Sequence, residues 1–381
     1  MKLLFHFIIN VFLAVFLFVF PRKKTIVICT GWGGDRFADN SRWMYLYLNE
    51  NIDKLGLKKI IWLANDKKIE KELGSAGYLA CQRSSWKSMY YHLRAGFFFY
   101  DQFSSDLLLP LTRGAKLVNM WHGLPIKKFG LSDPNNKSLS KLWNLDTSFL
   151  LSCSDFGDSL FKQCFKVKKE NMIHGMYPRD FYLINNMPFL TNLECEFLNI
   201  VKQKKKDGKK IVFYLPTFRK GKSDFLGVSN LAEIERFFFS LDKHGFFFVS
   251  KFHLVAAVKR FENYPSIVTT MLELPYEIDV YPFLKYADIL VTDYSSVLFD
   301  FLYLDRNIVC YAYDFDTYRK DDRGFILDYE KLPAIKTYTL SDLEKSILCI
   351  DKYDLHKQRE YWLDRCFGKL TMKNTVLNSL K

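Results

Sequence analysis

The stretch Ala287-Asp-Ile-Leu-Val-Thr-Asp-Tyr-Ser-Ser-Val-Leu-Phe-Asp300 decides the fold of this chain. Its residues 289–292 are typical of a buried strand, and the apolar run after Ser296 is typical of a helix. The turn between them holds Asp293, Ser295 and Ser296. Backbone N–H groups and hydroxyls at a helix N-terminus suit a phosphate, although a serine there is also an ordinary helix cap. The segment predicts a strand–turn–helix unit that could bind phosphate.

Short apolar runs alternate with helical stretches along the rest of the chain. Runs without a polar face are typical of strands covered on both sides, and therefore of parallel sheets. The expected strands are 25–29, 59–63, 96–100, 116–121, 148–152, 210–215, 245–250, 289–292 and 307–311. This alternation predicts a doubly wound α/β fold. We expect a helix to start at Ser41, and a last helical segment over about 340–380 to close the second domain and pack back on the first.

The pattern breaks once, between residues 185 and 210. Asn185-Asn-Met-Pro188 is typical of a turn, and a charged run at 202–210 follows before strands and helices alternate again. We expect one Rossmann-like domain over residues 25–195 and a second over residues 205–381. Two such domains facing each other across a cleft form the GT-B architecture. A length of 381 residues also favours two domains.

Residues 1–24 form a hydrophobic segment. Residues 3–20 are almost all apolar, and Pro21-Arg-Lys-Lys24 follows them. A helix of this length just reaches across the hydrocarbon core of a bilayer. We expect it to span the cytoplasmic membrane or lie in its surface, with the basic residues and the catalytic domains on the cytoplasmic side. The alternative is a helix buried against the protein itself.

Composition narrows the classes of partner. Hydrophobic residues make up 49% of the chain and aromatic residues 17%, which is ample for packed cores. The net charge of +13 favours an anionic partner, such as an acidic membrane surface or a phosphorylated substrate. The basic runs are not interleaved with aromatic residues, so we expect no nucleic-acid partner. Eight cysteines without CxxC spacing predict reduced core thiols rather than a zinc site.

Four of the expected strands are followed by residues whose side chains can bind a ligand or transfer a proton. Ligands of doubly wound sheets bind at the carboxyl ends of the strands. The four ends are followed by His122-Gly-Leu-Pro, Pro216-Thr-Phe-Arg219, Lys251-Phe-His253 and Asp293-Tyr-Ser-Ser296. Because these ends meet at one edge of each sheet, the sequence predicts a site that combines histidines, cations and hydroxyls.

The two histidines of this set suit different tasks. Gly123 and Pro125 predict a tight loop that leaves the His122 imidazole exposed, where it could take a proton from a hydroxyl. The alternative is a histidine that only bonds to the backbone. His253 with Lys251 and Arg219 would form a cationic wall for a diphosphate.

Three other candidates are expected to be structural. His174 and His244 lack neighbours that, like Lys251 and Arg219, would form a cationic wall. Asp314-Phe-Asp316 is similar to the DxD metal motif of other transferases, but it follows a strand of the second domain and is expected to cap a loop. The sequence therefore predicts no metal site.

The motifs, taken in order, resemble one known family. They are 121–127, 215–219, 251–253, 292–300 and 322–325, and they are similar to the motif series of the CDP-glycerol glycerophosphotransferases. These are teichoic-acid primases and polymerases, with related capsule and lipopolysaccharide enzymes. The segment 36–41 also resembles their acceptor-side domain, and the likeness covers about residues 25–345. It implies a GT-B transferase that works on lipid-linked acceptors at the inner face of the cytoplasmic membrane.

The resemblance also implies residue roles. His122 matches the general base, which would deprotonate an acceptor hydroxyl for attack on the β-phosphorus of CDP-glycerol, with CMP leaving. His253 matches a second essential histidine at the donor phosphates. The residues expected to bind the donor are Thr217, Arg219, Lys251, Asp293, Ser295, Ser296 and Arg323. Asp293 and Asp300 could instead orient the loop or cap the helix. No cofactor is expected besides the CDP-glycerol substrate.

Rival functions stay open on the sequence alone. A CDP-ribitol transferase or a GT-B enzyme that uses a nucleotide sugar would share the fold, and release of CMP separates phosphoalditol transfer from glycosyl transfer. Outside the enzymes, the rivals are a non-catalytic scaffold at the membrane, which binds anionic lipid, and a nucleic-acid-binding module, which steeply salt-dependent binding to any duplex would reveal. The acceptor, and the choice between one added unit and a polymer, are not encoded in any motif that we identify.

Overall fold

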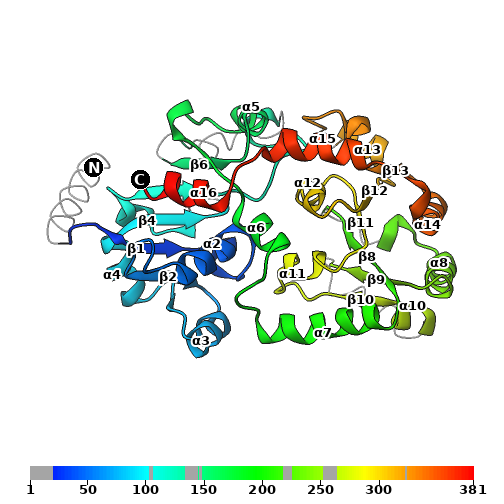
Figure 1. Ribbon diagram of the computed structural model, residues 1–381, viewed down its shortest axis with the longest axis horizontal. Coiled ribbons are helices and arrows are strands. Elements are labelled where there is room, and N and C mark those ends of the chain that lie inside the picture. Colours follow the sequence, from blue (N-terminus) through cyan, green and yellow to red (C-terminus); the bar gives the residue numbers. More distant parts are fainter. Residues whose placement is uncertain are drawn as a thin grey trace.

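The computed structural model describes residues 20–102, 106–133, 145, 148–217, 225–251, 264–321 and 324–381. Two parallel β-sheets lie side by side along the long axis of the molecule, one from each half of the chain (Figure 1). Helices pack on the faces of both sheets. The structure therefore confirms the predicted α/β fold with two doubly wound sheets.

The N-terminal sheet has seven parallel strands in the order β3-β2-β1-β4-β5-β6-β7. These strands are β1 (Lys23–Cys29), β2 (Lys59–Ala64), β3 (Ala80–Gln82), β4 (Ala95–Tyr100), β5 (Lys116–Asn119), β6 (Phe149–Ser152) and β7 (Met172–His174). Val27 of the central β1 lies between Ile60 and Phe97. Val27 packs in one core cluster and its neighbour Ile28 in another. The strand has no polar face because both faces are covered.

The C-terminal sheet has six parallel strands in the order β10-β9-β8-β11-β12-β13. These strands are β8 (Lys210–Leu215), β9 (Phe246–Ser250), β10 (Met271–Glu273), β11 (Ile289–Thr292), β12 (Asn307–Tyr311) and β13 (Ile335–Thr337). Leu290 of β11 lies between Phe213 and Ile308. Leu290 belongs to the same core cluster as Val27 of the first sheet. One apolar core therefore runs from sheet to sheet and holds them together.

The helices that connect the strands occur in the following order along the chain. In the N-terminal half they are α2 (Asp39–Glu50), α3 (Lys67–Ser75), α4 (Trp86–Arg94), α5 (Asp155–Cys164) and α6 (Pro178–Ile184). The linking helix is α7 (Asn192–Lys206), which starts at a capping box between Thr191 and Glu194. Those that follow are α8 (Leu231–Lys243), α10 (Pro265–Thr270), α11 (Tyr281–Leu284), α12 (Val297–Phe301), α13 (Phe315–Asp321), α14 (Leu340–Leu348), α15 (His356–Phe367) and α16 (Met372–Ser379).

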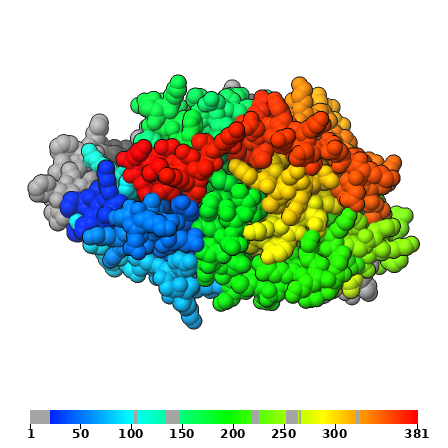
Figure 2. Space-filling model, viewed as in Figure 1, coloured from blue at the N-terminus to red at the C-terminus, as the bar shows by residue number. Residues whose placement is uncertain are grey.

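The end of the chain returns to the first half. α15 runs along the C-terminal half, and α16 packs against β7 of the N-terminal sheet (Figure 1). Thr375 Oγ1 donates to the carbonyl oxygen of Met176 at 2.7 Å, and Asn378 Nδ2 donates to that of His174 at 2.9 Å. Figure 2 shows this red segment lying on the surface beside the blue N-terminal residues. The predicted last helical segment is thus three helices, and its end packs on the first half as expected.

The start of the described chain differs from the expected basic cluster. β1 begins at Lys23, two residues before the predicted strand. The Arg22 guanidinium donates to the carbonyl oxygens of Ala95, Leu111 and Arg113 at 2.6–3.1 Å, so it binds the first half of the protein. Burial lowers its pKa to about 10. Residues 1–19 of the predicted membrane segment lie outside the described residues. Among the described helices, none has the length and apolar character needed to cross a bilayer.

Candidate active site

A cavity of about 230 Å³ lies between the two sheets. The N-terminal half contributes Trp32, Arg36, Asp39 and His122 to its wall, and the C-terminal half contributes Lys251 and Ser295 among others. These residues follow the carboxyl ends of β1, β5, β9 and β11. Ligands of doubly wound sheets bind at such ends. The structure therefore places four predicted site residues, His122, Lys251, Ser295 and Ser296, around one cavity.

A second cavity of about 340 Å³ adjoins the first. His122, Ser295 and Ser296 line both cavities. The wall of the second cavity is more apolar than that of the first and includes Phe129 and Tyr294. The histidine and the two serines thus stand where the cavities meet, which is a suitable place for two substrates to react.

His122 is oriented as a proton acceptor. Its Nδ1 lies 3.3 Å from the carbonyl oxygen of Asp101, which favours a proton on Nδ1 and leaves Nε2 without one. Its ring stacks on Trp121 with the centroids 4.1 Å apart, and is half-buried rather than exposed as predicted. Burial lowers the pKa of His122, while the nearby carboxylate of Asp39 opposes that shift. A neutral imidazole with a free Nε2 can take a proton from a hydroxyl.

The loop after His122 contacts the C-terminal half through a glycine. Gly123 has φ +113°, a conformation that other residues rarely adopt. A Cβ atom there would lie 2.6 Å from Arg179 Nη2 and 2.6 Å from Ser296 Oγ. Ser296 Oγ also donates to the carbonyl oxygen of His122 at 3.1 Å. The glycine therefore allows the two halves to approach each other at the site.

Two predicted donor-binding residues bind each other. Asp293 is 1% exposed, and its Oδ1 accepts hydrogen bonds from the backbone N–H of Thr217 at 2.8 Å and from Thr217 Oγ1 at 2.7 Å. The carboxylate thus joins the loop after β8 to the turn after β11. This is the loop-orienting role that the sequence left open for Asp293.

Two of the basic side chains that line the first cavity come from different halves of the chain. Lys251 donates through Nζ to the carbonyl oxygen of Ile278, and its pKa is lowered well below its usual value by burial and then by the charge of Arg36. The Arg36 guanidinium lies 4.7 Å from the ring centroids of both Trp32 and Tyr276. Arg36 belongs to the acceptor-like segment 36–41, but sequence reasoning gave it no role at the site.

A buried ion-pair network in the wall of the cavity is not predicted by the sequence. Arg179 Nη1 lies 2.7 Å from Asp39 Oδ1, and Arg179 Nη2 lies 2.8 Å from Asp300 Oδ2. Tyr281 donates to the same Asp300 oxygen at 2.6 Å. Arg179 sits at the start of α6 outside any recognisable motif, so only the fold reveals its partners. Asp300 is 1% exposed and anchors Arg179.

A second network joins the halves behind α2. Arg42 Nη2 donates to Glu194 Oε2 at 2.8 Å, and Trp43 Nε1 donates to Asp279 Oδ2 at 2.9 Å. Asp279 also lines the cavity. Both networks fix α2 against the C-terminal half.

The model of the CDP-glycerol:poly(glycerophosphate) glycerophosphotransferase family matches residues 11–366 of the chain. The chain belongs to this family. The match spans both sheets and confirms the family predicted from the motif series.

Relatives of this glycerophosphotransferase agree with the assignment. A teichoic acid poly(glycerol phosphate) polymerase of Bacillus spizizenii is 30% identical over 365 residues, which cover 89% of this chain and 86% of the relative. A teichoic acid glycerol-phosphate transferase of Staphylococcus aureus is 29% identical over 328 residues, covering 81% and 79%. A solved wall teichoic acid polymerase, TagF, matches with a TM-score of 0.73 and 19% identity, covering 94% of this chain and 89% of that one. The solved structure confirms the fold.

Three predicted residues of the glycerophosphotransferase lie outside the described residues: Arg219, His253 and Arg323. The segment beside Arg323 is described. The backbone N–H of Lys128 donates to the carbonyl oxygen of Gly324 at 3.0 Å, and that of Ile326 donates to Ile126 at 2.9 Å. The loop after β5 is therefore paired with the loop before β13, beside the second cavity that Ile126 lines.

The structural candidates do not line the two cavities described above. His244 is exposed and bonds to the carbonyl oxygen of Ser240 at 2.8 Å. Asp314 Oδ1 accepts a hydrogen bond from the Tyr294 hydroxyl at 3.0 Å, and Asp314 and Asp316 line a separate cavity of about 450 Å³ at the start of α13. The loop-capping role of Asp314 stays a prediction.

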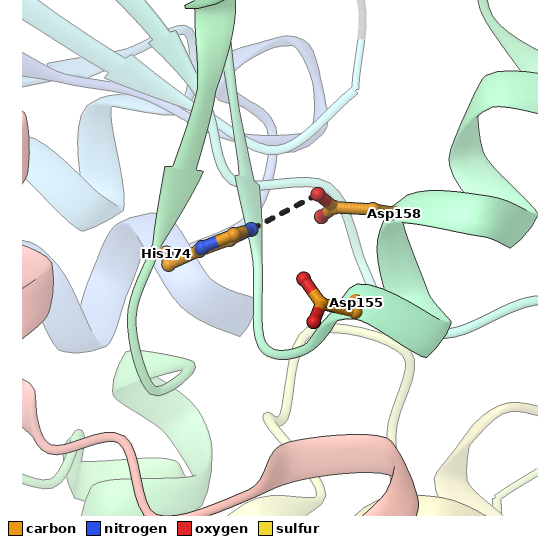
Figure 3. Close-up of side chains that lie close together, drawn as sticks. All are labelled: Asp155, Asp158 and His174. Atoms are coloured by element: carbon orange, nitrogen blue, oxygen red, sulfur yellow. Dashed lines mark hydrogen bonds and ion pairs between the residues drawn. The ribbon is translucent and has the colours of Figure 1, made fainter. Parts of the chain in front are cut away.

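One group of side chains has metal-ligand character. Asp155 and Asp158 at the start of α5 face His174 at the end of β7, and their ligand atoms lie within 4.8 Å of one another (Figure 3). His174 Nε2 and Asp158 Oδ2 are 3.0 Å apart, as in an ordinary pair beside a helix N-terminus. None of these three residues lines either described cavity. We assign them no role in the transfer reaction.

Proposed function

We propose that this protein transfers glycerol phosphate from CDP-glycerol to a hydroxyl of a glycan or polyol-phosphate acceptor, with release of CMP, in teichoic acid synthesis. The observation that carries the proposal is the family match over residues 11–366, which includes the whole cleft around His122. The curated relatives named above act on poly(glycerol phosphate) or glycerol phosphate.

The chemistry needs a base, a phosphate site and two substrates side by side. His122 Nε2 takes the proton of the acceptor hydroxyl, and the hydroxyl oxygen attacks the β-phosphorus of CDP-glycerol. The bond from that phosphorus to the CMP oxygen breaks, and CMP leaves with the negative charge. Ser295, Ser296 and Lys251 face the cavity where the phosphates would lie. Phosphoryl transfer depends mainly on such positioning and charge stabilisation.

The proposal includes a place in the cell. The acceptor would be lipid-linked, and the two sheets would work at the cytoplasmic face of the membrane. The apolar residues 3–20 and the net charge of +13 support attachment to an anionic surface. Fractionation of cells that make the full chain and a chain without residues 1–19 tests this. Equal recovery of both in the soluble fraction would contradict the membrane location.

The donor is tested by CMP release. CDP-glycerol, CDP-ribitol and nucleotide sugars would be offered in parallel with membranes as acceptor, and the His122→Ala variant would serve as control. The proposal is supported if the wild-type protein, and not the variant, releases CMP from CDP-glycerol. Turnover of a nucleotide sugar without CMP release would replace it with glycosyl transfer.

A ribitol donor is the second candidate. A teichoic acid poly(ribitol-phosphate) polymerase of Bacillus spizizenii is 26% identical over 397 residues, which cover 96% of this chain and 57% of the relative. The glycerol relatives are more similar, so CDP-glycerol remains the first choice. A higher kcat/KM for CDP-ribitol would reverse that order.

A further inference from the structure

Asp39 occupies an unusual position in the cleft. It is the first residue of α2 and lines the same cavity as His122. Its φ is +65°, in the left-handed region that side chains other than glycine rarely adopt. Such a conformation persists only where the surroundings hold it, and it is common at functional sites. Asp39 is also 8% exposed, so its charge is largely shielded from water.

The contacts of Asp39 fix one carboxylate oxygen and leave the other without a hydrogen-bond partner among the residues that the structure describes. Oδ1 accepts hydrogen bonds from Arg179 Nη1 at 2.7 Å and from the backbone N–H of Asn40 at 2.9 Å. The backbone N–H of Asp39 donates to Asp279 Oδ2 at 3.2 Å. No hydrogen bond joins Oδ2 to another described residue. The carboxylate is therefore rigid, with one oxygen available in the cleft.

The surroundings of His122 contain both signs of charge. The titratable and charged groups that surround it or line its cavities are Arg36, Asp39, Asp101, Lys127, Arg179, Lys251, Asp279, Tyr281 and Tyr294. Burial lowers the pKa of His122 most, and Arg179 and Lys127 lower it further. Asp39 is the strongest charge acting in the opposite direction. Asp101 acts on the ring only through its backbone carbonyl group.

We propose that Asp39 is the electrostatic partner of His122, whose carboxylate stabilises the imidazolium that forms during the reaction. The acceptor O–H bond breaks, its proton moves to Nε2, the new O–P bond forms and the bond to CMP breaks. Asp39 receives no proton and touches no reacting atom, so it is a positioning residue. This inference rests on the proposed function for the identity of the attacking hydroxyl. The interaction between the two side chains does not depend on it.

The Asp39→Asn variant isolates the charge. Asparagine has the same shape and adopts the left-handed conformation more readily than most residues. A base that loses its anionic partner becomes weaker, so the acid limb of kcat/KM for CMP release should move to lower pH. The plateau at higher pH should fall at least tenfold. The full-length protein with labelled histidines should show the His122 resonance titrating at lower pH by NMR.

Asp300→Asn is the matched control. Asp300 bonds to the other side of Arg179 but does not line the cavity. The variant should lose stability and keep the position of the acid limb. If Asp39→Asn lowered the rate equally at every pH and left the His122 titration unchanged, the residue would be only a structural anchor.

The wild-type protein gives a measurement that does not require the variant to fold. Two interacting groups each sense the titration of the other. The labelled carboxyl carbon of Asp39 should therefore show a chemical-shift step at the pH where His122 titrates. The absence of that step would overturn the inference. If the chemical-shift step of Asp39 were present but no CMP were released, the proposed function would be contradicted and the interaction between Asp39 and His122 would stand.

Discussion

Ser296 Oγ donates a hydrogen bond to the carbonyl oxygen of His122 at 3.1 Å. The serine lies just before α12 of the C-terminal half, and the histidine follows β5 of the N-terminal half. This bond ties the base directly to the turn proposed to hold the donor phosphates. The distance between base and phosphorus is therefore set by packing between the halves, and small changes at the contact should alter the rate.

Gly123→Ala tests this contact. The added Cβ would lie 2.6 Å from both Arg179 Nη2 and Ser296 Oγ, at a backbone φ of +113°. We expect a loss of about 2–4 kcal/mol in the free energy of unfolding, since strain and overpacking each cost about 1–3 kcal/mol. The rate of CMP release should fall at least about 100-fold, because a misplacement of 1 Å can cost that much.

Gly208→Ala is the control for backbone strain. Gly208 has a similar positive φ of +80°, and a Cβ there would meet nothing within 4 Å. It should lose only about 1–2 kcal/mol, the cost of the left-handed conformation, and keep its activity. Equal activity losses in the two variants would show that the contact across the cleft is irrelevant.

His122→Gln should abolish the proton transfer while keeping the donor site. We expect CMP release to fall about 10²–10⁴-fold, the usual contribution of a general base. CDP-glycerol affinity, measured by calorimetry, should stay nearly constant because the residues proposed to bind the phosphates are unchanged. His244→Gln changes an exposed histidine at the end of α8 and should be fully active. A large loss of donor affinity in His122→Gln would argue for a binding role instead.

Arg179→Gln should be strongly destabilising. The variant leaves Asp39 and Asp300 buried without their shared cation. Removing one partner from a buried ion pair costs about 3–5 kcal/mol, which urea unfolding would measure. Lys210→Met breaks a pair of similar length, 2.9 Å to Asp351, but both side chains are exposed. That variant should change stability by less than about 1 kcal/mol. Similar losses of unfolding free energy in the two variants would mean that burial does not determine how strongly these ion pairs stabilise the protein.

Stability should decline in acid because of His92. Burial lowers the pKa of His92 to about 4 in the folded protein, below its ordinary value of 6.5. The unfolded chain therefore binds a proton below pH 6.5, whereas the folded protein does not until about pH 4. The stability contribution is present above pH 6.5 and is lost as the pH falls, by about 3 kcal/mol at pH 4.

The His92→Gln variant isolates this effect. The difference in unfolding free energy between wild type and variant should narrow by about 2–3 kcal/mol between pH 7 and pH 4.5. A constant difference over that interval would show that His92 does not titrate on unfolding.

The sequence predicts the central strands better than the edges. β8, β11 and β12 have the predicted bounds, because continuous apolar runs mark strands covered on both faces. The sequence does not predict the three-residue edge strands β3, β7, β10 and β13, since a strand with a partner on one side only leaves little pattern to detect. The start of α2 was placed at Ser41 rather than Asp39, because a left-handed first residue has no helix-start signal.

The same limit applies to the site. His122, Lys251, Ser295 and Ser296 could be found because each follows a strand whose end points to the cleft. Asp39 and Arg179 could not, because their importance comes from a contact between residues 140 positions apart in the chain. Local patterns identify groups that bind ligands, whereas the charges that tune those groups depend on tertiary packing.

The packing of α16 on β7 has a consequence for synthesis of the protein on the ribosome. All seven strands of the N-terminal sheet have been made once His174 is added, but Thr375, which fills the space beside Gly175, comes 200 residues later. Synthesis adds roughly 5–20 residues per second, so α16 is completed on the order of ten seconds or more after β7. Until then the outer surface of β7 stays exposed. During that interval the nascent first half exposes an unfinished sheet edge, which makes it a natural client for chaperones.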